Sequence, residues 1–360
     1  MRRLNVTELA AQPTSVQDHF FDSGGTRLHA VSTGRGPLVV FCHGFPGLWY
    51  SWHRQLTAVA GAGFRAVALD QRGYGQSDRP LAVSAYDSEQ HCRDLLALLA
   101  HFGEREACFV GHDFGAAQVC NMAVRYPQHC RALVHVSCPY DFDLAGRGCA
   151  GSDAVARDYG RPFALPHIKP SDCFAAIAEQ HFFHMHYFQT VGPAERELGA
   201  NAAEFLQRLY WSLSAEGNLL GWDRFPSVGT GYLDVLAPAP PLPWGWLEQA
   251  DIAYLTSQYL LAGEELAFIG GLNSYRVADR NWELGKPWAD ARVEVPSLFI
   301  AGQQDAVLQL VGAGALGLMR ERMPRLAATV LIPGAGHFVQ LEQAEAFNRA
   351  LLDFLAAGSG

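Results

Sequence analysis

The stretch Val110-Gly111-His112-Asp113-Phe114-Gly115-Ala116 decides how the rest of the chain is interpreted. Residues 108–110 before it form a short apolar run typical of a buried strand, and residues 115–124 carry small and apolar side chains at helical spacing. Small residues on both sides of a central residue are typical of a nucleophile elbow, a sharp strand-to-helix turn with no room for neighbouring β-carbons. Asp113 occupies the centre, where the G-x-S-x-G pattern has serine. The alternative is that Asp113 only caps the helix that follows.

The composition is that of a large globular protein. The 360 residues are 49% hydrophobic and carry a formal net charge of -9, with no run of Lys and Arg. This charge balance gives no reason to expect nucleic acid or an anionic membrane as a partner. Residues 1–8 contain two arginines with no apolar segment behind them, and no apolar run is long enough to span a bilayer. We therefore expect a cytoplasmic protein.

The eight cysteines are scattered, lack C-x-x-C spacing, and in several cases lie within apolar runs. These features favour buried free thiols over disulfides. The cysteines are Cys42, Cys92, Cys108, Cys120, Cys130, Cys138, Cys149 and Cys173.

Strand-like and helix-like segments alternate along two parts of the chain, and this alternation predicts a mostly parallel, doubly wound sheet. The predicted strands are 19–22, 27–33, 37–42, 64–69, 132–137, 296–302 and 329–332. The predicted helices include 52–60, a helix capped by Asp87-Ser88 and ended by Gly103, the helix after Asp113, a stretch to about 323, and 341–355.

The alternation is interrupted from about residue 144 to residue 287. This interval has few strand-like runs, is rich in His, Phe, Tyr and Trp, and contains the Pro-rich run 236–243, which predicts a stiff connector. We interpret 144–287 as an inserted, largely helical domain between two parts of one core, 1–143 and 288–360. Its aromatic residues could line an apolar binding site or form the core of the insert itself. They include Phe163, Phe182, Phe188, Trp211, Trp222, Trp244 and Trp246.

Five motifs occur in a fixed order along the chain. They are His43-Gly44-Phe45-Pro46, the turn 70–78, the stretch around Asp113, Gly302-Gln303-Gln304-Asp305, and Gly334-Ala335-Gly336-His337-Phe338. In this order, with a helical insert before the fourth motif, the chain resembles the α/β-hydrolase fold and, within it, the epoxide hydrolase family. The resemblance covers essentially the whole chain. It implies that the insert is a cap over the elbow.

The resemblance also implies a catalytic triad. In this fold the nucleophile, the acid and the histidine follow one another along the chain, and Asp113, Asp305 and His337 have that order. Taken singly, Asp305 could be a helix cap and His337 an ordinary loop histidine. Together they predict that Asp113 attacks, and that His337, oriented by Asp305, activates a water molecule.

A carboxylate nucleophile indicates chemistry at saturated carbon. Attack by serine would leave an ether, whereas attack by Asp113 leaves an ester that water can cleave. The expected reaction is the hydrolysis of an epoxide, an ether-bond hydrolysis, to a vicinal diol through an ester on Asp113. The backbone amides of Phe45 and Phe114 would form the oxyanion hole. We expect a small hydrophobic epoxide as substrate and no cofactor, and we leave a homodimer open.

An epoxide oxygen leaves as an alkoxide and needs proton donors. Family members place two donors in the cap, usually tyrosines, and the resemblance assigns Tyr275, within residues 272–282, to one of these positions. The run 184–189 resembles a family Tyr-x-x-Tyr-Phe-Gln run, which puts His184 at the other donor position. A different alignment of this run would let Tyr187 serve instead. The predicted substrate contacts are Tyr187, Phe188 and Trp211.

A metal site at His181, His184 and His186 is not expected, because on a helix His186 would lie about 200° from His184. The main alternative function is that of a haloalkane or haloacid dehalogenase with the same nucleophile. Haloalkane relatives tend to have Trp where this chain has Phe114, and haloacid relatives have Arg where residues 115–121 have none. A non-catalytic binding protein is the third alternative, and the complete triad argues against it.

Overall fold

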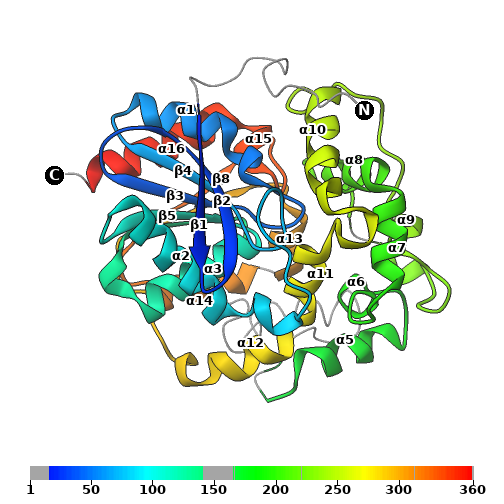
Figure 1. Ribbon diagram of the computed structural model, residues 1–360. Coiled ribbons are helices and arrows are strands. Elements are labelled where there is room, and N and C mark those ends of the chain that lie inside the picture. Colours follow the sequence, from blue (N-terminus) through cyan, green and yellow to red (C-terminus); the bar gives the residue numbers. More distant parts are fainter. Residues whose placement is uncertain (1–15, 141–164, 166, 220, 312, 359–360) are drawn as a thin grey trace.

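A mostly parallel sheet lies at the centre of the computed structural model, which describes residues 16–140, 165, 167–219, 221–311 and 313–358 (Figure 1). Eight described strands follow the order β1-β2-β4-β3-β5-β6-β7-β8. Strand β2 is antiparallel to β1 and β4, and the other neighbours are parallel, as the alternation of segments predicts. The strands are β1 Gln17–Ser23, β2 Thr26–Gly34, β3 Leu38–Cys42, β4 Arg65–Asp70, β5 Ala107–His112, β6 Cys130–Val136, β7 Ser297–Gly302 and β8 Leu326–Ile332.

Strand β3 explains why the central strands appear as continuous apolar runs. All five of its residues are buried. Leu38, Val40 and Cys42 pack into the apolar cluster on one face of the sheet, whereas Val39 and Phe41 pack into the cluster on the other face. A parallel strand that is covered on both faces has no side that favours polar residues.

Helices cover both faces of this sheet. Apolar residues of α1 and α16 belong to the cluster on one face, and those of α2, α3 and α14 belong to the cluster on the other. The helix signals near Asp87 are confirmed, because its side chain accepts the Gln90 amide at 2.9 Å and Gly103 ends α2 with a φ of 69°. The helices of the core are α1 His53–Gly61, α2 Ser88–Phe102, α3 Phe114–Arg125, α13 Ala306–Val311, α14 Ala313–Arg322, α15 Val339–Glu342 and α16 Ala344–Ala357.

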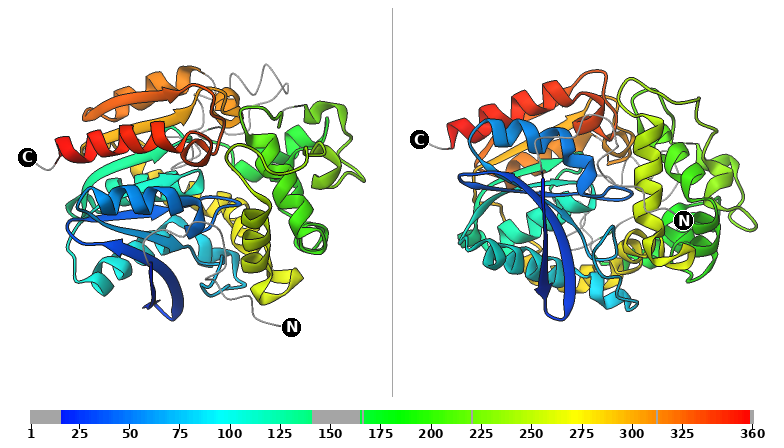
Figure 2. Two further views of the ribbon diagram at one scale, coloured as in Figure 1. Left: turned by 90° about the horizontal axis from the view of Figure 1, so that it is seen from above. Right: turned by 45° about the horizontal axis from the view of Figure 1, so that its top comes forward.

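A second group of helices lies together beside the sheet, coloured green to yellow in both views of Figure 2. These helices are α5 Pro170–Ala178, α6 His184–Tyr187, α7 Pro193–Ala200, α8 Ala202–Leu213, α9 Tyr232–Val235, α10 Gln249–Tyr259, α11 Ile269–Arg276 and α12 Ala278–Gly285. They pack on the core through one apolar cluster that also contains Phe45, Leu48, Tyr74 and Phe338. We call this group the cap. The predicted start of the insert at residue 144 lies outside the described residues, as does Phe163.

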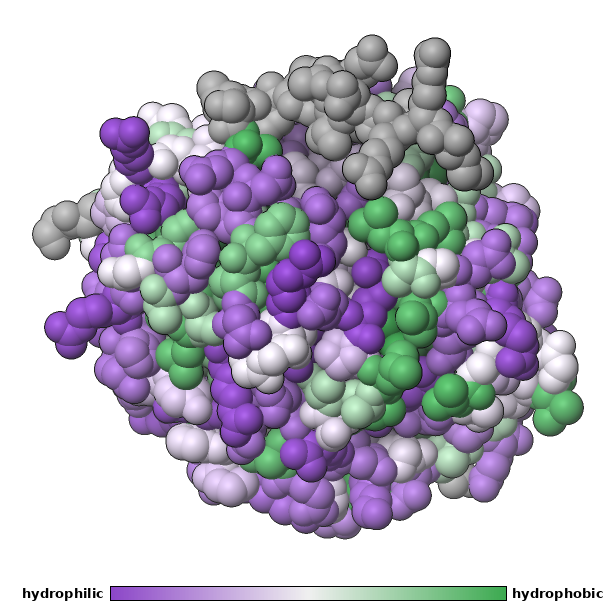
Figure 3. Space-filling model, in the orientation of Figure 1, coloured by the Kyte–Doolittle hydropathy of each residue, from purple (hydrophilic) through white to green (hydrophobic). Residues whose placement is uncertain are grey.

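The seven described cysteines are free and buried, which confirms the interpretation for them, and Cys149 lies outside the described part of the chain. None of the helices within the described ranges combines the length and apolarity needed to cross a membrane. The face shown in Figure 3 carries hydrophilic residues interspersed with small apolar groups.

Candidate active site

Asp113 joins β5 to α3 in a strained turn. Its φ of 55° and ψ of -123° are uncommon for a residue with a side chain. A β-carbon on Gly111 would overlap the carbonyl oxygen of Gly115, and a β-carbon on Gly115 would overlap that of Cys42. Asp113 occupies the N-cap position of α3, but its side chain makes no capping hydrogen bond. The helix-cap alternative is therefore wrong, and the turn has the geometry of an elbow.

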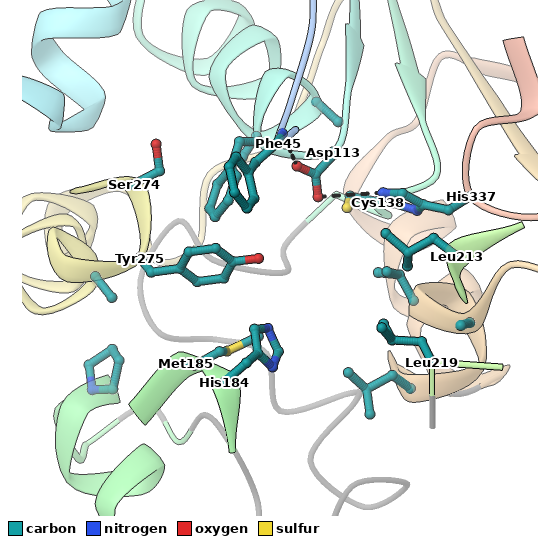
Figure 4. A pocket seen from close by; sticks show the side chains of 18 of the residues that line it. Phe45, Asp113, Cys138, His184, Met185, Leu213, Leu219, Ser274, Tyr275 and His337 are labelled. Atoms are coloured by element: carbon teal, nitrogen blue, oxygen red, sulfur yellow. Dashed lines mark hydrogen bonds and ion pairs between the residues drawn. The ribbon is translucent and has the colours of Figure 1, made fainter. Parts of the chain in front are cut away.

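The Asp113 carboxylate lies between a backbone amide and an imidazole (Figure 4). The Phe45 amide donates to its Oδ1 at 2.8 Å, and Nε2 of His337 lies 3.7 Å from its Oδ2. A β-carbon on Gly44 would overlap the carboxylate, so only glycine allows the turn after β3 to approach so closely. Burial raises the pKa of Asp113, but His337, His112 and the Phe45 amide hold that pKa below its ordinary value. The carboxylate is therefore ionised at neutral pH.

Asp305 is fully buried beyond the end of β7. Its two carboxylate oxygens lie 3.1 and 3.2 Å from Nδ1 of His337. The same carboxylate accepts the backbone N–H of Val307 at 2.8 Å and so holds the first turn of α13. One side chain thus caps the first turn of α13 and contacts His337, so the helix-cap interpretation is confirmed and the role of Asp305 as orienting acid stays a prediction.

The backbone of His337 is held from three directions. Ser137 Oγ donates to its carbonyl oxygen at 2.9 Å, and Nε2 of His112 lies 2.8 Å from the same oxygen. Its amide donates to the Leu213 carbonyl at the end of α8 at 2.9 Å. The loop that carries His337 is therefore joined to both the sheet and the cap.

Two carboxylates, those of Asp305 and Asp113, lie beside the His337 imidazole. Burial by itself would lower the pKa of His337, but the carboxylates of Asp305 and Asp113 raise it to about 10. The imidazole is consequently protonated at neutral pH for as long as Asp113 is ionised. Any reaction that neutralises Asp113 removes one of the two charges that keep the imidazole protonated.

Tyr275 of α11 and His184 of α6 face Asp113 from the cap (Figure 4). Their rings meet edge to face, with centroids 5.4 Å apart. Burial and the charge of Asp113 raise the pKa of Tyr275 well above its usual value, so its hydroxyl keeps its proton. Burial lowers the pKa of His184 to about 3, so its imidazole is neutral, and its Nδ1 has no hydrogen-bond partner in the described part of the chain. The structure thus brings two neutral donors opposite a carboxylate.

A cavity lies between Asp113 and the two cap residues Tyr275 and His184. The three residues predicted to contact substrate do not line this cavity. The Tyr187 hydroxyl donates to Glu197 at 2.7 Å, which removes the geometric basis for Tyr187 as the first donor. Phe188 is fully buried behind the donors, with its ring 5.1 Å from that of Tyr275. Trp211 packs against Trp244 at 5.1 Å instead, because α8 turns Leu209 and Leu213 to the cavity and residue 211 lies about 200° around the helix.

The cavity is enclosed mainly by apolar side chains from the core and the cap. Those residues include Phe45, Phe114, Ala116, Ala117, Pro139, Phe174, Met185, Leu209, Leu213, Leu219, Trp222, Val307 and Leu310. Sequence reasoning missed Tyr232, which also lines it. No local pattern marks this residue, because α9 is only four residues long and shows no periodicity.

His181, His184 and His186 do not lie on one helix. Helix α6 begins at His184, so His181 is not part of it. Within the ranges that the structure describes, no three His, Cys, Asp or Glu side chains are grouped to hold a metal ion.

Comparison with known proteins agrees with this geometry. Residues 37–147 match the family model described as alpha/beta hydrolase fold. The chain is 35% identical over 343 residues to Epoxide hydrolase A of Mycobacterium tuberculosis, covering 94% of this chain and 97% of that protein. It is 33% identical to Epoxide hydrolase B of the same organism, covering 92% and 96%. The chain belongs to the epoxide hydrolase family.

Solved epoxide hydrolases also have the same fold. An epoxide hydrolase from an endophytic Streptomyces superposes with a TM-score of 0.82 at 34% identity, covering 95% of each chain. Epoxide Hydrolase A from Mycobacterium thermoresistibile gives a TM-score of 0.78 at 34% identity, covering 95% of this chain and 98% of that one. The resemblance that the five motifs carry therefore extends over cap and core together.

Proposed function

We propose that the protein hydrolyses a small hydrophobic epoxide to a vicinal diol through a covalent ester on Asp113. One observation carries this proposal: an ionised carboxylate at the elbow faces the neutral donors Tyr275 and His184 across an apolar cavity. A carboxylate can open a strained ring at saturated carbon, and the opposite donors meet the charge that develops on the oxygen. The apolar lining supports a hydrophobic substrate.

In the first step, an Asp113 oxygen forms a bond to one ring carbon, and the bond from that carbon to the epoxide oxygen breaks. The electron pair stays on the epoxide oxygen, which accepts the Tyr275 proton, while the N–H of His184 donates a hydrogen bond to it. Proton transfer requires that Tyr275 be protonated at the start, and its raised pKa ensures this. Asp113 becomes a neutral ester, and Tyr275 becomes a phenolate.

In the second step, water attacks the carbonyl carbon of the ester. The neutral ester no longer supports protonation of His337, whose pKa falls, so the imidazole gives up its proton, which reaches the Tyr275 phenolate through solvent. The neutral imidazole can then accept a proton from the attacking water. Asp305 holds the ring through Nδ1. The Phe45 amide, 2.8 Å from Oδ1 before reaction, would donate to the developing oxyanion, with the Phe114 amide as its partner. The bond between the carbonyl carbon and the ester oxygen then breaks, and the leaving alkoxide takes the proton of the new carboxyl group. The diol leaves with Asp113 ionised, Tyr275 protonated and His337 protonated, as at the start.

The dehalogenase alternative is less well supported. A halide leaves without a proton, so it makes no use of a protonated Tyr275. Phe114 has no side-chain N–H to bind a halide, and residues 115–121 contain no arginine. A binding protein without activity would not require a strained carboxylate at an elbow.

One experiment tests the proposal directly. A panel of epoxides and haloalkanes is assayed for diol and for halide, followed by a single turnover in heavy-oxygen water with the best epoxide. Because water attacks the ester carbonyl, the label is expected in the Asp113 carboxylate and absent from the first diol. Label in that diol, or halide release without any diol, would overturn the proposal.

A cytoplasmic location and a homodimer are further proposals, which cell fractionation and analytical ultracentrifugation would test.

A further inference from the structure

The cap presents a second tyrosine to the cavity. Tyr232 begins α9, is 3% exposed, and lines the cavity together with Asp113, His184 and Tyr275. Its ring stacks on that of His184, with centroids 5.7 Å apart and planes inclined by 16°. Tyr275 meets the same imidazole edge to face. His184 therefore lies between two tyrosine rings.

The backbone around Tyr232 is tightly held. Glu197 accepts the amides of Tyr232 and Leu233 at 3.0 and 2.9 Å. The Glu197 carboxylate also lies close to Gly231, where a β-carbon would overlap it unless the Glu197 side chain moved. The Tyr232 ring is also packed edge to face against Phe188, with centroids 5.2 Å apart. The position of the ring is thus set before any substrate binds.

The Tyr232 hydroxyl differs from the other buried tyrosine hydroxyls in its hydrogen bonding. Buried tyrosines usually find a hydrogen-bond partner for the hydroxyl. No such partner is present for Tyr232 among the residues that the structure describes, and the same holds for Tyr275. Every other tyrosine that is buried in the described ranges has one: these are Tyr74, Tyr86, Tyr140, Tyr210, Tyr254 and Tyr259. Tyr232 is thus the one buried tyrosine of the described ranges whose hydroxyl has no partner, and it lines the cavity, as does the half-buried Tyr275.

The Tyr232 hydroxyl also lies in the field of the nucleophile. Burial raises the pKa of Tyr232, and Asp113 is the charge that raises it most, ahead of Glu197. The hydroxyl is therefore a protonated donor at neutral pH. His184 is neutral and has only one N–H to offer. An alkoxide oxygen, in contrast, can accept more than one hydrogen bond.

We propose that the hydroxyl of Tyr232 donates a hydrogen bond to the epoxide oxygen during ring opening and is a further catalytic residue beside Tyr275. This inference rests on the proposed function. Tyr275 transfers its proton to the oxygen as the carbon–oxygen bond breaks, whereas Tyr232 keeps its proton and stabilises the charge. The donor arrangement then consists of two tyrosines from α9 and α11 with the imidazole of His184 between them.

The test removes the hydroxyl and keeps the ring. Tyr232→Phe is compared with Tyr254→Phe, which removes another buried cap hydroxyl that lies outside the cavity and accepts from Trp49 at 3.0 Å. Alkylation and ester hydrolysis are measured separately by stopped flow, with Trp222 at the cavity as the fluorescent reporter. Thermal unfolding of each variant is recorded in parallel.

Tyr232→Phe is expected to slow alkylation by about 10- to 100-fold, to leave ester hydrolysis unchanged, and to keep the wild-type melting temperature. Tyr254→Phe should leave both rates unchanged. The loss should be similar for epoxides with and without a second oxygen function. A loss confined to epoxides with a second oxygen would mean that Tyr232 binds that substituent, and the inference would fail.

The failure of this inference is distinguishable from that of the proposed function. If wild type forms diol but Tyr232→Phe alkylates at the wild-type rate, only the inference is overturned. If wild type forms no diol from any epoxide, the proposed function itself fails.

Discussion

The cavity has a core wall, which carries Asp113 and His337, and a cap wall, which carries His184, Tyr232 and Tyr275. Different interactions hold the side chains of these two walls in place. On the core wall, Asp113 accepts an amide hydrogen bond, and Asp305 holds both His337 and the start of α13. On the cap wall, His184, Tyr232 and Tyr275 are held by ring contacts, and all three residues line the cavity. The hydrogen bonds of the core wall are thus formed without substrate, whereas the donors of the cap wall find a hydrogen-bond acceptor only when an epoxide oxygen is present. From this difference we expect the donors of the cap to act in ring opening, and His337 and Asp305 of the core to act in ester hydrolysis.

One half-buried carboxylate, that of Glu342, joins the histidine loop of the core to the cap. Glu342 accepts the amides of Gly336 and Phe338, which flank His337, and also the amide of Ala215 just after α8 of the cap. The distances are 2.9, 3.1 and 2.8 Å. The position of the cap relative to the histidine loop is therefore set by hydrogen bonds as well as by apolar packing.

The largest expected effect tests the core wall alone. His337→Gln removes the base and should slow ester hydrolysis by about 1,000-fold while leaving alkylation largely intact. Intact-protein mass should then rise by the mass of one substrate, on the peptide that contains Asp113. Loss of activity without an adduct would mean that His337 acts before the ester forms, and the division between the walls would be broken.

The next effect tests the cap wall. Tyr275→Phe should slow alkylation by about 100-fold, because the alkoxide loses its proton donor, and should leave hydrolysis of a formed ester near normal. Single-turnover kinetics separate the two rates. His184→Phe should have the same selectivity with a smaller loss, and a variant that slows both steps equally would contradict a cap role limited to ring opening.

A smaller effect concerns how the cap wall is positioned. Arg276, next to Tyr275, donates to the Phe188 carbonyl at 2.7 Å and pairs with Glu195 at 2.7 Å, so it ties α11 to the segment that follows His184. Arg276→Met should slow alkylation by about tenfold through misplacement of the donors, with ester hydrolysis unchanged. Arg276→Lys should restore part of the rate.

Arg224→Met is the matched control for this prediction, because it removes an exposed cap arginine that lies outside the cavity lining. Equal losses in the Arg276 and Arg224 variants, or equal losses in both kinetic steps, would show that Arg276 does not act through the donors.

The smallest effect is a difference in pH dependence between the rate of alkylation and the rate of ester hydrolysis. Alkylation should be flat from about pH 5 to about pH 9, because Asp113 is ionised, Tyr275 is protonated and His184 is neutral throughout this range. Ester hydrolysis needs neutral His337, so its rate should rise with pH to a plateau. The midpoint should lie below about 10, because the ester has removed the Asp113 charge that helps to raise the pKa of His337 in the free protein. Alkylation that rises toward acid pH would point to a protonated His184.

Much of the core could be predicted because its signals are local. The continuous apolar run of β3, the Asp87 cap and the glycines around Asp113 each constrain a few neighbouring residues. The order of the motifs indicated Asp305 and His337, and in the structure His337 lies 3.7 Å from Asp113 while Asp305 contacts His337. The cap gave weaker signals. Tyr187, Phe188 and Trp211 were chosen for their residue types, but their orientations depend on packing between helices that are far apart in the sequence.

The sequence by itself determined the succession of strands and helices along the chain and the elbow, because strand periodicity and tight turns depend on neighbouring residues. The order of the five motifs along the chain, in turn, indicated Asp305 and His337 as the partners of Asp113. Only the tertiary structure decided which side chains of the cap face the nucleophile. Tyr187 and Tyr232 are both tyrosines near the same Glu197, yet one hydroxyl bonds to that carboxylate while the other residue lines the cavity. The reason is physical: on short helices the direction of a side chain is set by the contacts of its ring with distant segments, and a linear pattern of residue types does not contain those contacts.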